Sequence, residues 1–552
     1  MPDDPVELRR LGRSMGYRSN PVEDLVAQWR RHAREVRRIH EKLFYRPLLN
    51  AVARLDPGEA RLSLDAAGDR LVALGYADPQ GAIHHLQALT AGVSRRAAIQ
   101  RTLLPVMLGW FADAPDPDAG LLGFRRVSDA LGATHWYLGL LRDESVAAER
   151  MSRLMATSRF VTGLLMHAPE SVSLLAHDED LEPRPREALL SEIEAIVERH
   201  TDPQAAVAAV RAMRRRELFR TGAAEVLRLT SPVQSGPALS SVATVALEGA
   251  LHVARMAVED AEAVTFTIIG MGRLGGQELG FGSDVDVMFV YEPRPGVDEE
   301  RGLKAAAALA EEVRRLLMAP SEDPPLDVDA RLRPEGKQGP LVRSLASYAM
   351  YYERWSSVWE SQALIRADVA AGDAELGARF LALIDPVRWA QDRSEDDFVE
   401  VRRLKARMES ERLPRGADPQ LHTKLGRGGL SDVEWTVQML QMRYAGKVPG
   451  LRTPRTLQAL DAARDAEVIS ANDALVLRAS WLLASAVRNA IMLVRGMPGD
   501  TLPLDVLELR AVAYVLGYPL DDSGRLVEDY RRTTRRARQV CERVFYGVNN
   551  AG

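Results

Sequence analysis

The 552-residue chain is 46% hydrophobic and 27% charged, a composition that excludes fibrous and disordered proteins and provides for about three or four globular units. Its 72 basic and 77 acidic residues give a formal net charge of −5, which argues against a nucleic-acid partner. A single cysteine, Cys541, excludes an internal disulfide framework. The charged start lacks a secretory signal and polar residues interrupt the apolar runs, so we expect a cytoplasmic protein with no membrane partner.

Helical periodicity covers most of the chain and gives way once to a stretch rich in β-branched residues. The fold class is therefore predicted to be mostly α with one α/β island, flanked by N-terminal and C-terminal helical bundles. The predicted domains are a helical linker segment (1–60), an N-terminal helical region (61–235), the α/β core (236–375) and a C-terminal helical bundle (376–552).

Three strands are predicted inside the island. VTFTIIG (264–270) and DVDVMFVYE (284–292) are rich in β-branched and aromatic residues, and LDVDARLRP (326–334) is a third run that Pro334 ends. The segment LKAAAALAEEVRRLLMA (303–319) predicts a helix between the second and third strands.

A glycine-rich turn follows the first strand, where Gly270, Gly272 and Gly275 form a G-x-G-x-x-G pattern. The second strand begins too soon afterwards for a crossover helix of ordinary length, which argues against a dinucleotide-binding fold. The backbone N–H groups of such a turn can cradle phosphate, and the alternative is a tight connection without a ligand.

Two aspartates mark the start of the second strand. Side chains two positions apart in a strand share a face, so Asp284 and Asp286 point the same way, while Val285 and Val287 point to the core. Neighbouring carboxylates repel one another unless a cation neutralises them, and oxygen ligands of this kind suit Mg²⁺. The pair is therefore a candidate metal site, and the alternative is a strand-entry turn without a ligand.

The third predicted strand has one charged face. Asp327, Asp329, Arg331 and Arg333 alternate with apolar residues, an arrangement that is costly unless the charged face lines a site or is a solvated edge. Carboxylates that hold metal ions, together with arginines that hold phosphates, are what two-metal nucleotidyl transfer requires.

The motifs GMGRLGGQELGFGSDVD (270–286) and DARLRPEG (329–336) together resemble the catalytic core of the glutamine synthetase adenylyltransferase family. That family belongs to the polymerase-β-like nucleotidyltransferase superfamily. Two later segments, VWESQALIRADVAAGD (358–373) and KLGRGGLSDVEWTVQMLQMRYAG (424–446), are similar to segments that follow the core in this family.

The resemblance implies a function. Members of the family are multifunctional enzymes that carry two activities and regulate nitrogen metabolism. One half transfers AMP from ATP to a tyrosine of glutamine synthetase, releasing pyrophosphate, and the other half removes AMP by phosphorolysis, giving ADP. Only one S-D-x-D core is present here, so the chain resembles one half. The sequences ELGFGSDVD and WESQALIRA resemble the C-terminal, adenylylating half more closely, and the first 50 residues resemble the linker that leads into it.

The family also implies roles for individual residues. Asp284 and Asp286 match its metal-holding pair, and Asp329 matches its third catalytic and metal-binding carboxylate, with Asp327 as the rival that spacing cannot separate. Glu278 is expected to brace the glycine turn. The residues expected to contact nucleotide or phosphate are Gly272, Gly275, Gly276, Ser283, Arg331, Arg333 and Lys424.

The implied cofactor is Mg²⁺, with two ions, and ATP is the implied substrate. Glutamine synthetase is the implied protein partner, and a PII signalling protein is a further candidate. The alternatives are the adenylyl-removing reaction, uridylylation of a PII protein, a nucleic-acid-directed transferase, and an inactive helical scaffold. Two local expectations complete the analysis: a capping box from Ser431 to Glu434, and core positions for Tyr352, Trp355 and Trp359.

Overall fold

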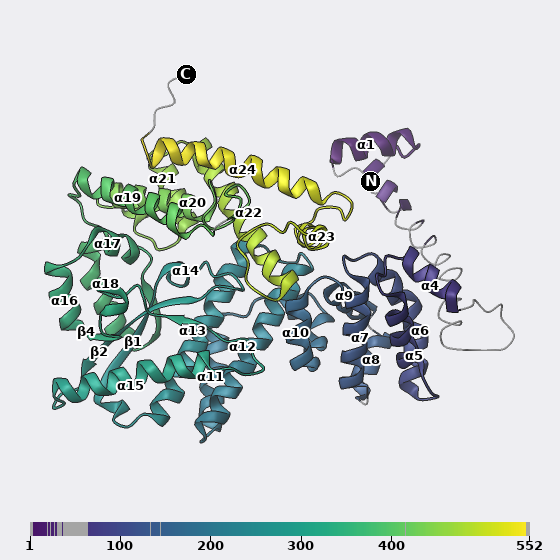
Figure 1. Ribbon diagram of the computed structural model, residues 1–552, viewed down its shortest axis with the longest axis horizontal. Coiled ribbons are helices and arrows are strands. Elements are labelled where there is room, and N and C mark those ends of the chain that lie inside the picture. Colours follow the sequence, from purple (N-terminus) through teal and green to yellow (C-terminus); the bar gives the residue numbers. More distant parts are fainter. Residues whose placement is uncertain are drawn as a thin grey trace. The chain divides into compact units, whose positions relative to one another are not determined.

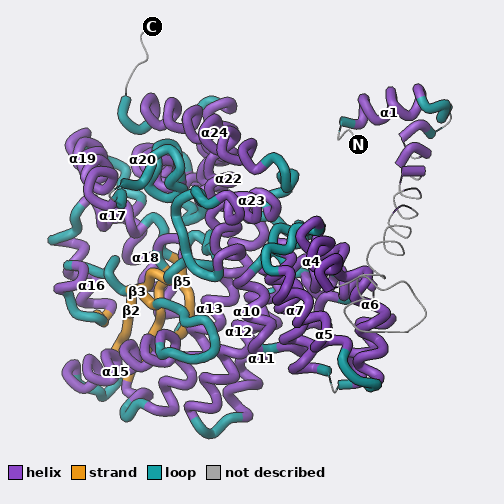
Figure 2. The backbone as a smooth tube through the Cα atoms, turned by 45° about the vertical axis from the view of Figure 1, so that its right-hand side comes forward, coloured by secondary structure: helices purple, strands orange, loops and turns teal. Residues whose placement is uncertain are grey.

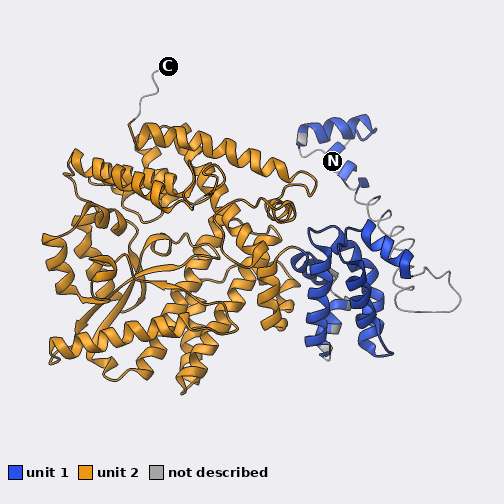
Figure 3. Cartoon of the chain, in the orientation of Figure 1, with its two compact units in different colours: residues 1–156 blue, residues 157–552 orange. Residues whose placement is uncertain are grey.

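The computed structural model describes residues 64–547, apart from positions 133, 144 and 415, together with residues 4–18 and scattered positions between 20 and 36. The chain divides into two compact units, residues 1–156 and 157–552 (Figure 3). This division falls inside the predicted helical region 61–235, and the core and C-terminal bundle share one unit. The rest of the predicted linker, residues 37–60, lies outside the described residues.

The first unit is helical in all the elements that the structure describes. Aspartate followed by proline begins three of its helices, because the carboxylate of Asp4, Asp78 or Asp116 caps the helix and proline suits the first turn. Its helices are α1 (Pro5–Ser14), α4 (Leu64–Ala73), α5 (Pro79–Thr90), α6 (Arg95–Ala112), α7 (Pro117–Leu131), α8 (His135–Asp143) and α9 (Ser145–Met155).

The second unit surrounds a small sheet with helices (Figure 1). Four helices precede the sheet: α10 (Arg159–His167), α11 (Arg186–Arg199), α12 (Pro203–Val226) and α13 (Pro232–Ala257). The α/β region contains β1 (Val264–Gly270), α14 (Gly272–Gly275), β2 (Val285–Pro293), α15 (Glu299–Met318), β3 (Val328–Asp329), β4 (Val342–Ser344), α16 (Leu345–Arg354), α17 (Val358–Leu364), β5 (Asp368–Gly372) and α18 (Ala374–Arg388).

The C-terminal helices return to the all-helical pattern. They are α19 (Glu395–Arg412), α20 (Leu430–Tyr444), α21 (Thr456–Asp465), α22 (Ala471–Arg495), α23 (Val506–Val515) and α24 (Ser523–Val544). The predicted fold class, mostly α with one α/β island, is confirmed (Figure 2).

The sheet has the strand order β3-β2-β1-β5, with β4 also pairing with β2. The pairs β1–β2 and β1–β5 are antiparallel, whereas β3 and β4 run parallel to β2. In the β2–β3 ladder, Val285 lies opposite Val328 and Asp286 opposite Asp329. Parallel pairing in this register places two aspartates from distant parts of the chain side by side.

Helices cover both faces of the sheet. On one face, Ile269 and Met288 belong to a buried cluster with Tyr348 of α16 and Phe380 of α18. On the other face, the rings of Phe266 and Phe289 lie 5.9 Å apart, and α13 and α15 pack there. Because side chains alternate between the two faces along β2, Asp286 lies on the same face of the sheet as Met288. The acidic group therefore lies at the end of the strand, next to the buried apolar cluster.

The prediction of a third strand over 326–334 was too long, since β3 ends at Asp329. The Asp329 carboxylate accepts a hydrogen bond from the backbone N–H of Arg331 at 2.8 Å, which turns the chain out of the sheet. Arg331 and Arg333 therefore do not share a strand face with Asp329. The strands β4 and β5 were not among the predicted elements.

Two other local predictions were wrong. Ser431 does not cap a helix, because α20 begins at Leu430 with Gly429 at the N-cap. Trp355 is 73% exposed and is not a core residue, while Tyr352 is buried as predicted.

Two helices, α13 and α22, are long and apolar enough to cross a membrane by length and composition alone. Within the protein, 72% and 56% of their most apolar windows are buried. Burial against other parts of the same fold is typical of core helices, and it agrees with the sequence-based expectation that these runs do not span a membrane.

Candidate active site

Three carboxylates meet at the end of β2. Asp284 precedes the strand, Asp286 is its second residue, and Asp329 ends the parallel neighbour β3. Each offers an oxygen atom, and these oxygens lie within 4.8 Å of one another. The expectation that Asp284 and Asp286 share a face therefore agrees with the structure.

Charge repulsion and burial act on Asp286. Burial, together with the nearby charges of Asp284 and Asp329, raises the pKa of the Asp286 carboxyl to about 7. Burial also raises the pKa of Asp329, but hydrogen bonds and charge from Arg331 outweigh that effect and hold the pKa below its usual range. A group of hard oxygen donors with one carboxyl at a raised pKa is suited to a divalent cation, which would neutralise the repulsion.

A cavity of about 520 Å³ opens beside these carboxylates. Its walls come from α15, β3 and the loop that follows β3, and they mix acidic with basic side chains. The lining residues are Asp284, Glu311, Arg314, Met318, Asp327, Val328, Asp329, Ala330, Arg331, Arg333, Lys337 and Leu341.

The structure separates the two rivals for the third carboxylate. Asp329 belongs to the cluster with Asp284 and Asp286, whereas Asp327 is exposed and lines only the cavity. The parallel register decides this, because it places Asp329 opposite Asp286.

The two arginines after β3 have different surroundings. Arg331 is 59% exposed and forms an ion pair with the Asp329 carboxylate. Arg333 is half-buried and donates hydrogen bonds to the backbone carbonyls of Ala330 at 2.7 Å and Gly339 at 3.0 Å. Its guanidinium therefore holds the loop in shape, and Arg331 is the more accessible cation.

Among the glycines of the turn, Gly272 lies closest to the acidic group. Its φ is +54°, and a Cβ atom there would lie 2.6 Å from Oδ2 of Asp286. Gly275 and Gly276 are buried, and a Cβ atom on either would collide with Arg366. Close packing accounts for these two glycines, so their predicted phosphate contacts have no support from their positions.

A buried polar network fixes the turn. Arg366, 5% exposed, donates hydrogen bonds to the carbonyl of Gly272 at 2.9 Å and to Oε2 of Glu278 at 2.7 Å. Glu278 also accepts from the backbone N–H of Thr456 at 2.6 Å, at the start of α21. The expected bracing role of Glu278 agrees with this geometry, and the network ties the turn to the C-terminal helices.

Ser283 and Lys424 complete the predicted set. The Ser283 hydroxyl accepts a hydrogen bond from the backbone N–H of Gly280 at 3.0 Å, which closes the turn just before Asp284. Lys424 is exposed in the loop before α20, and its charge acts on Asp286 by lowering the pKa of that carboxyl. Lys424 thus lies near enough to the acidic group to interact electrostatically with it.

Three residues of this site carry no local signal in the sequence. Arg366 lies in the segment 358–373 that carried the family resemblance, but a buried arginine cannot be distinguished from an exposed one by pattern. Arg314 and Lys337 line the cavity from α15 and from the loop after β3. Their positions depend on tertiary packing, and the basic residues of a helix face give no local sign of it.

Comparison with known proteins finds similar enzymes and two family models. Residues 148–383 match the family model of glutamate-ammonia ligase adenylyltransferase, and residues 402–545 match that of GlnD PII-uridylyltransferase. A bifunctional glutamine synthetase adenylyltransferase/adenylyl-removing enzyme from Streptomyces avermitilis is 57% identical over 99% of this chain and 57% of its own length. Its counterpart from Mycobacterium tuberculosis is 47% identical over 99% of this chain and 56% of its own length.

The chain spans about half the length of the curated relatives it matches. The first family match contains the whole sheet, the acidic group and the glycine turn, and the second contains the loop of Lys424. The part of the chain that holds the three carboxylates is therefore similar to the glutamate-ammonia ligase adenylyltransferase family.

Proposed function

We propose that this chain transfers AMP from ATP to a tyrosine of glutamine synthetase, as the adenylylating half of a bifunctional enzyme. The observation that supports this most is the group formed by Asp284, Asp286 and Asp329, whose oxygens lie within 4.8 Å of one another beside an open cavity. The identity with adenylyltransferase/adenylyl-removing enzymes over 99% of the chain supports the choice of substrate.

The three carboxylates fit Mg²⁺, because they supply only hard oxygen ligands and because burial and repulsion make an ionised Asp286 costly without a cation. Bound Mg²⁺ ions supply charge neutralisation on the phosphates and increase the acidity of a coordinated hydroxyl. The chain's residues orient the reactants: Asp284, Asp286 and Asp329 hold the metal ions, while Arg331 and Lys424 attract the triphosphate.

The tyrosine must lose its proton to attack the α-phosphate. A free tyrosine has a pKa of about 10, so a carboxylate beside it is needed at neutral pH. Asp329 is our candidate for this role, because it lies in the acidic group and its carboxylate is ionised, with a pKa that Arg331 holds below its usual range. The tyrosine oxygen then forms a bond to the α-phosphorus while the bond to pyrophosphate breaks.

The adenylylating direction rests on the resemblance of two motifs, ELGFGSDVD (278–286) and WESQALIRA (359–367), to the adenylylating half. The match of residues 402–545 to a PII-uridylyltransferase model does not favour uridylylation, since the relatives that cover 99% of this chain are named for adenylyl transfer and removal. A regulatory PII protein remains part of the proposal as a second partner.

The test incubates this protein with α-labelled ATP, Mg²⁺ and unmodified glutamine synthetase, beside an Asp284→Ala/Asp286→Ala double variant. We expect label on a tyrosine of glutamine synthetase, and a loss of at least about 10²-fold in the variant. Phosphate-dependent release of ADP from pre-adenylylated glutamine synthetase, with no labelling of the unmodified enzyme, would reverse the proposed direction. An inactive chain in both assays would leave the scaffold hypothesis.

A further inference from the structure

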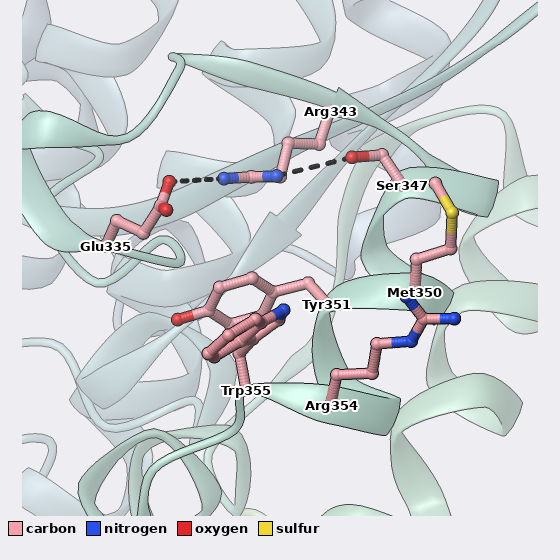
Figure 4. A pocket seen from close by; sticks show the side chains of 7 residues that line it. All are labelled: Glu335, Arg343, Ser347, Met350, Tyr351, Arg354 and Trp355. Atoms are coloured by element: carbon pink, nitrogen blue, oxygen red, sulfur yellow. Dashed lines mark hydrogen bonds and ion pairs between the residues drawn. The ribbon is translucent and has the colours of Figure 1, made fainter.

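A second cavity, of about 560 Å³, is lined in part by Glu335 of the loop that follows β3 (Figure 4). One face of α16 forms its wall, because Ser347, Met350, Tyr351 and Arg354 recur at spacings of three and four. Glu335, Arg343 and Trp355 complete the lining, and the cavity shares no lining residue with the one beside the carboxylates.

Two large apolar side chains of this cavity face solvent. Trp355 is 73% exposed and Met350 is 59% exposed. Together they keep apolar surface in water within one cavity, as surfaces that bind other proteins often do. The walls are too open to enclose a small ligand, so they suit part of a larger molecule.

The charges of the cavity leave one cation available. Arg343 donates a hydrogen bond to Oε2 of Glu335 at 2.6 Å and another to Ser347, as the dashed lines of Figure 4 show. Arg354 is exposed and makes no hydrogen bond or ion pair with the residues that the structure describes. An acidic side chain beside an apolar one would complement Arg354 and Trp355.

The same loop connects this cavity to the carboxylates. Arg331, Arg333 and Lys337 line the catalytic cavity, and Glu335, between them in sequence, lines the second one. Glu335 has a φ of +63°, a left-handed conformation that only surrounding contacts maintain in a non-glycine residue, and Arg343 supplies one of them. The loop is thus held in a defined shape and contributes lining residues to both cavities.

We propose that this second cavity binds a polypeptide segment of the protein that is adenylylated, with an apolar side chain on Trp355 and Met350 and an acidic one at Arg354. The inference rests on the proposed function and extends it, because it assigns recognition of the protein substrate to a surface apart from the ATP site. Tryptophan and arginine are the residues that most often dominate such interfaces.

The experiment measures the KM for unmodified glutamine synthetase and for ATP in Trp355→Ala and Arg354→Glu. Each change should raise the KM for glutamine synthetase about tenfold and leave the KM for ATP and kcat at saturation unchanged. Trp355→Phe and Arg354→Lys should recover most of the affinity. Matched controls are Trp136→Ala, an exposed tryptophan in the first unit, and Arg199→Glu, an exposed arginine at the end of α11, and both should behave as wild type.

An unchanged KM for glutamine synthetase in both cavity variants would overturn the proposal. A rise in the KM for ATP instead would also overturn it, because it would mean that the cavity binds nucleotide. If the wild-type protein transfers no AMP, the proposed function fails separately, and direct binding to immobilised glutamine synthetase then decides the matter. Equal binding by wild type and both variants in that assay would refute docking at this cavity.

Discussion

The pKa of one side chain, Asp286, reflects the electrostatics of the whole acidic group. Asp286 lies between two other carboxylates, and burial with their repulsion raises its pKa to about 7. An ionised Asp286 therefore destabilises the folded protein, and a neutral residue at this position would give a more stable fold. Such a cost is expected at a site whose ligand offsets it, and the ligand that we propose here is a divalent cation.

Replacing this carboxylate by its amide should stabilise the metal-free protein. At pH 8 we expect Asp286→Asn to raise the free energy of unfolding by about 1–3 kcal/mol, because the wild-type charge is destabilising there. The folded-state pKa of about 7 lies above the ordinary 3.8, so wild-type stability recovers as pH falls from 7 toward 4 and the advantage of the variant disappears. Urea unfolding at several pH values measures it.

The same variant should lose at least about 10²-fold in AMP transfer, so stability and activity move in opposite directions. The exposed residue Asp521 provides a control, since Asp521→Asn should change neither quantity. A destabilised Asp286→Asn protein would show that the carboxylate takes part in the fold rather than opposing it.

A single glycine controls the space beside Asp286. Gly272→Ala adds a Cβ atom 2.6 Å from Oδ2 of Asp286 at a φ of +54°. We expect a loss of about 1–2 kcal/mol in stability from the left-handed backbone, and a loss of about 10²-fold in transfer activity from the displaced carboxylate. Unfolding and steady-state kinetics measure the two effects.

Gly296 supplies the matched control. It has a φ of +87°, but a Cβ atom there meets nothing within 4 Å. Gly296→Ala should therefore carry the same backbone cost with normal activity. Equal activities in the two variants would mean that the approach of Gly272 to Asp286 does not matter for the reaction.

At the scale of elements, the glycine turn depends on residues from three parts of the chain. Arg366 follows α17, Glu278 follows α14, and Thr456 begins α21, yet their side chains form one buried network. The turn is thus held by the C-terminal helices as well as by the two strands that it connects.

Breaking this network should affect both stability and catalysis. Arg366→Met leaves Glu278 buried without its cation, which should cost about 3–5 kcal/mol, and it frees the carbonyl of Gly272. Arg220→Met is the control, since Arg220 is 8% exposed and pairs with the buried Glu217 in α12 at 2.9 Å. Both variants should lose stability, whereas only Arg366→Met should lower kcat per folded molecule. Similar kinetics in the two would limit Arg366 to a role in folding.

At the scale of the whole molecule, the carboxylates, the glycine turn, Lys424 and both cavities belong to the second compact unit. The α/β core and the C-terminal helices are connected by buried hydrogen bonds, of which the one from the backbone N–H of Thr456 to Glu278 at 2.6 Å is an example. This unit therefore contains every candidate residue of the site.

Residues 157–552 alone should fold and keep the site. We expect the isolated fragment to unfold in a single cooperative transition and to bind Mg-ATP with the same affinity as the full chain, since its core is its own. Calorimetry and titration with a fluorescent ATP analogue measure these properties. A fragment that is folded but does not bind Mg-ATP would show that the first unit contributes to the site.

The sequence by itself determined the features that depend on local pattern. The alternation in DVDVMFVYE placed Asp284 and Asp286 on one face and buried Val285 and Val287, because successive side chains in a strand point to opposite sides. Helical periodicity likewise predicted a mostly α fold with a single α/β island.

Tertiary structure decided what depends on contacts between distant segments. The parallel register of β2 and β3 selected Asp329 over Asp327 for the acidic group, and packing against Arg366 explained Gly275 and Gly276. The exposure of Trp355 was likewise invisible in the sequence. Period and composition specify which face of an element is apolar, but only the folded chain determines which other element covers that face.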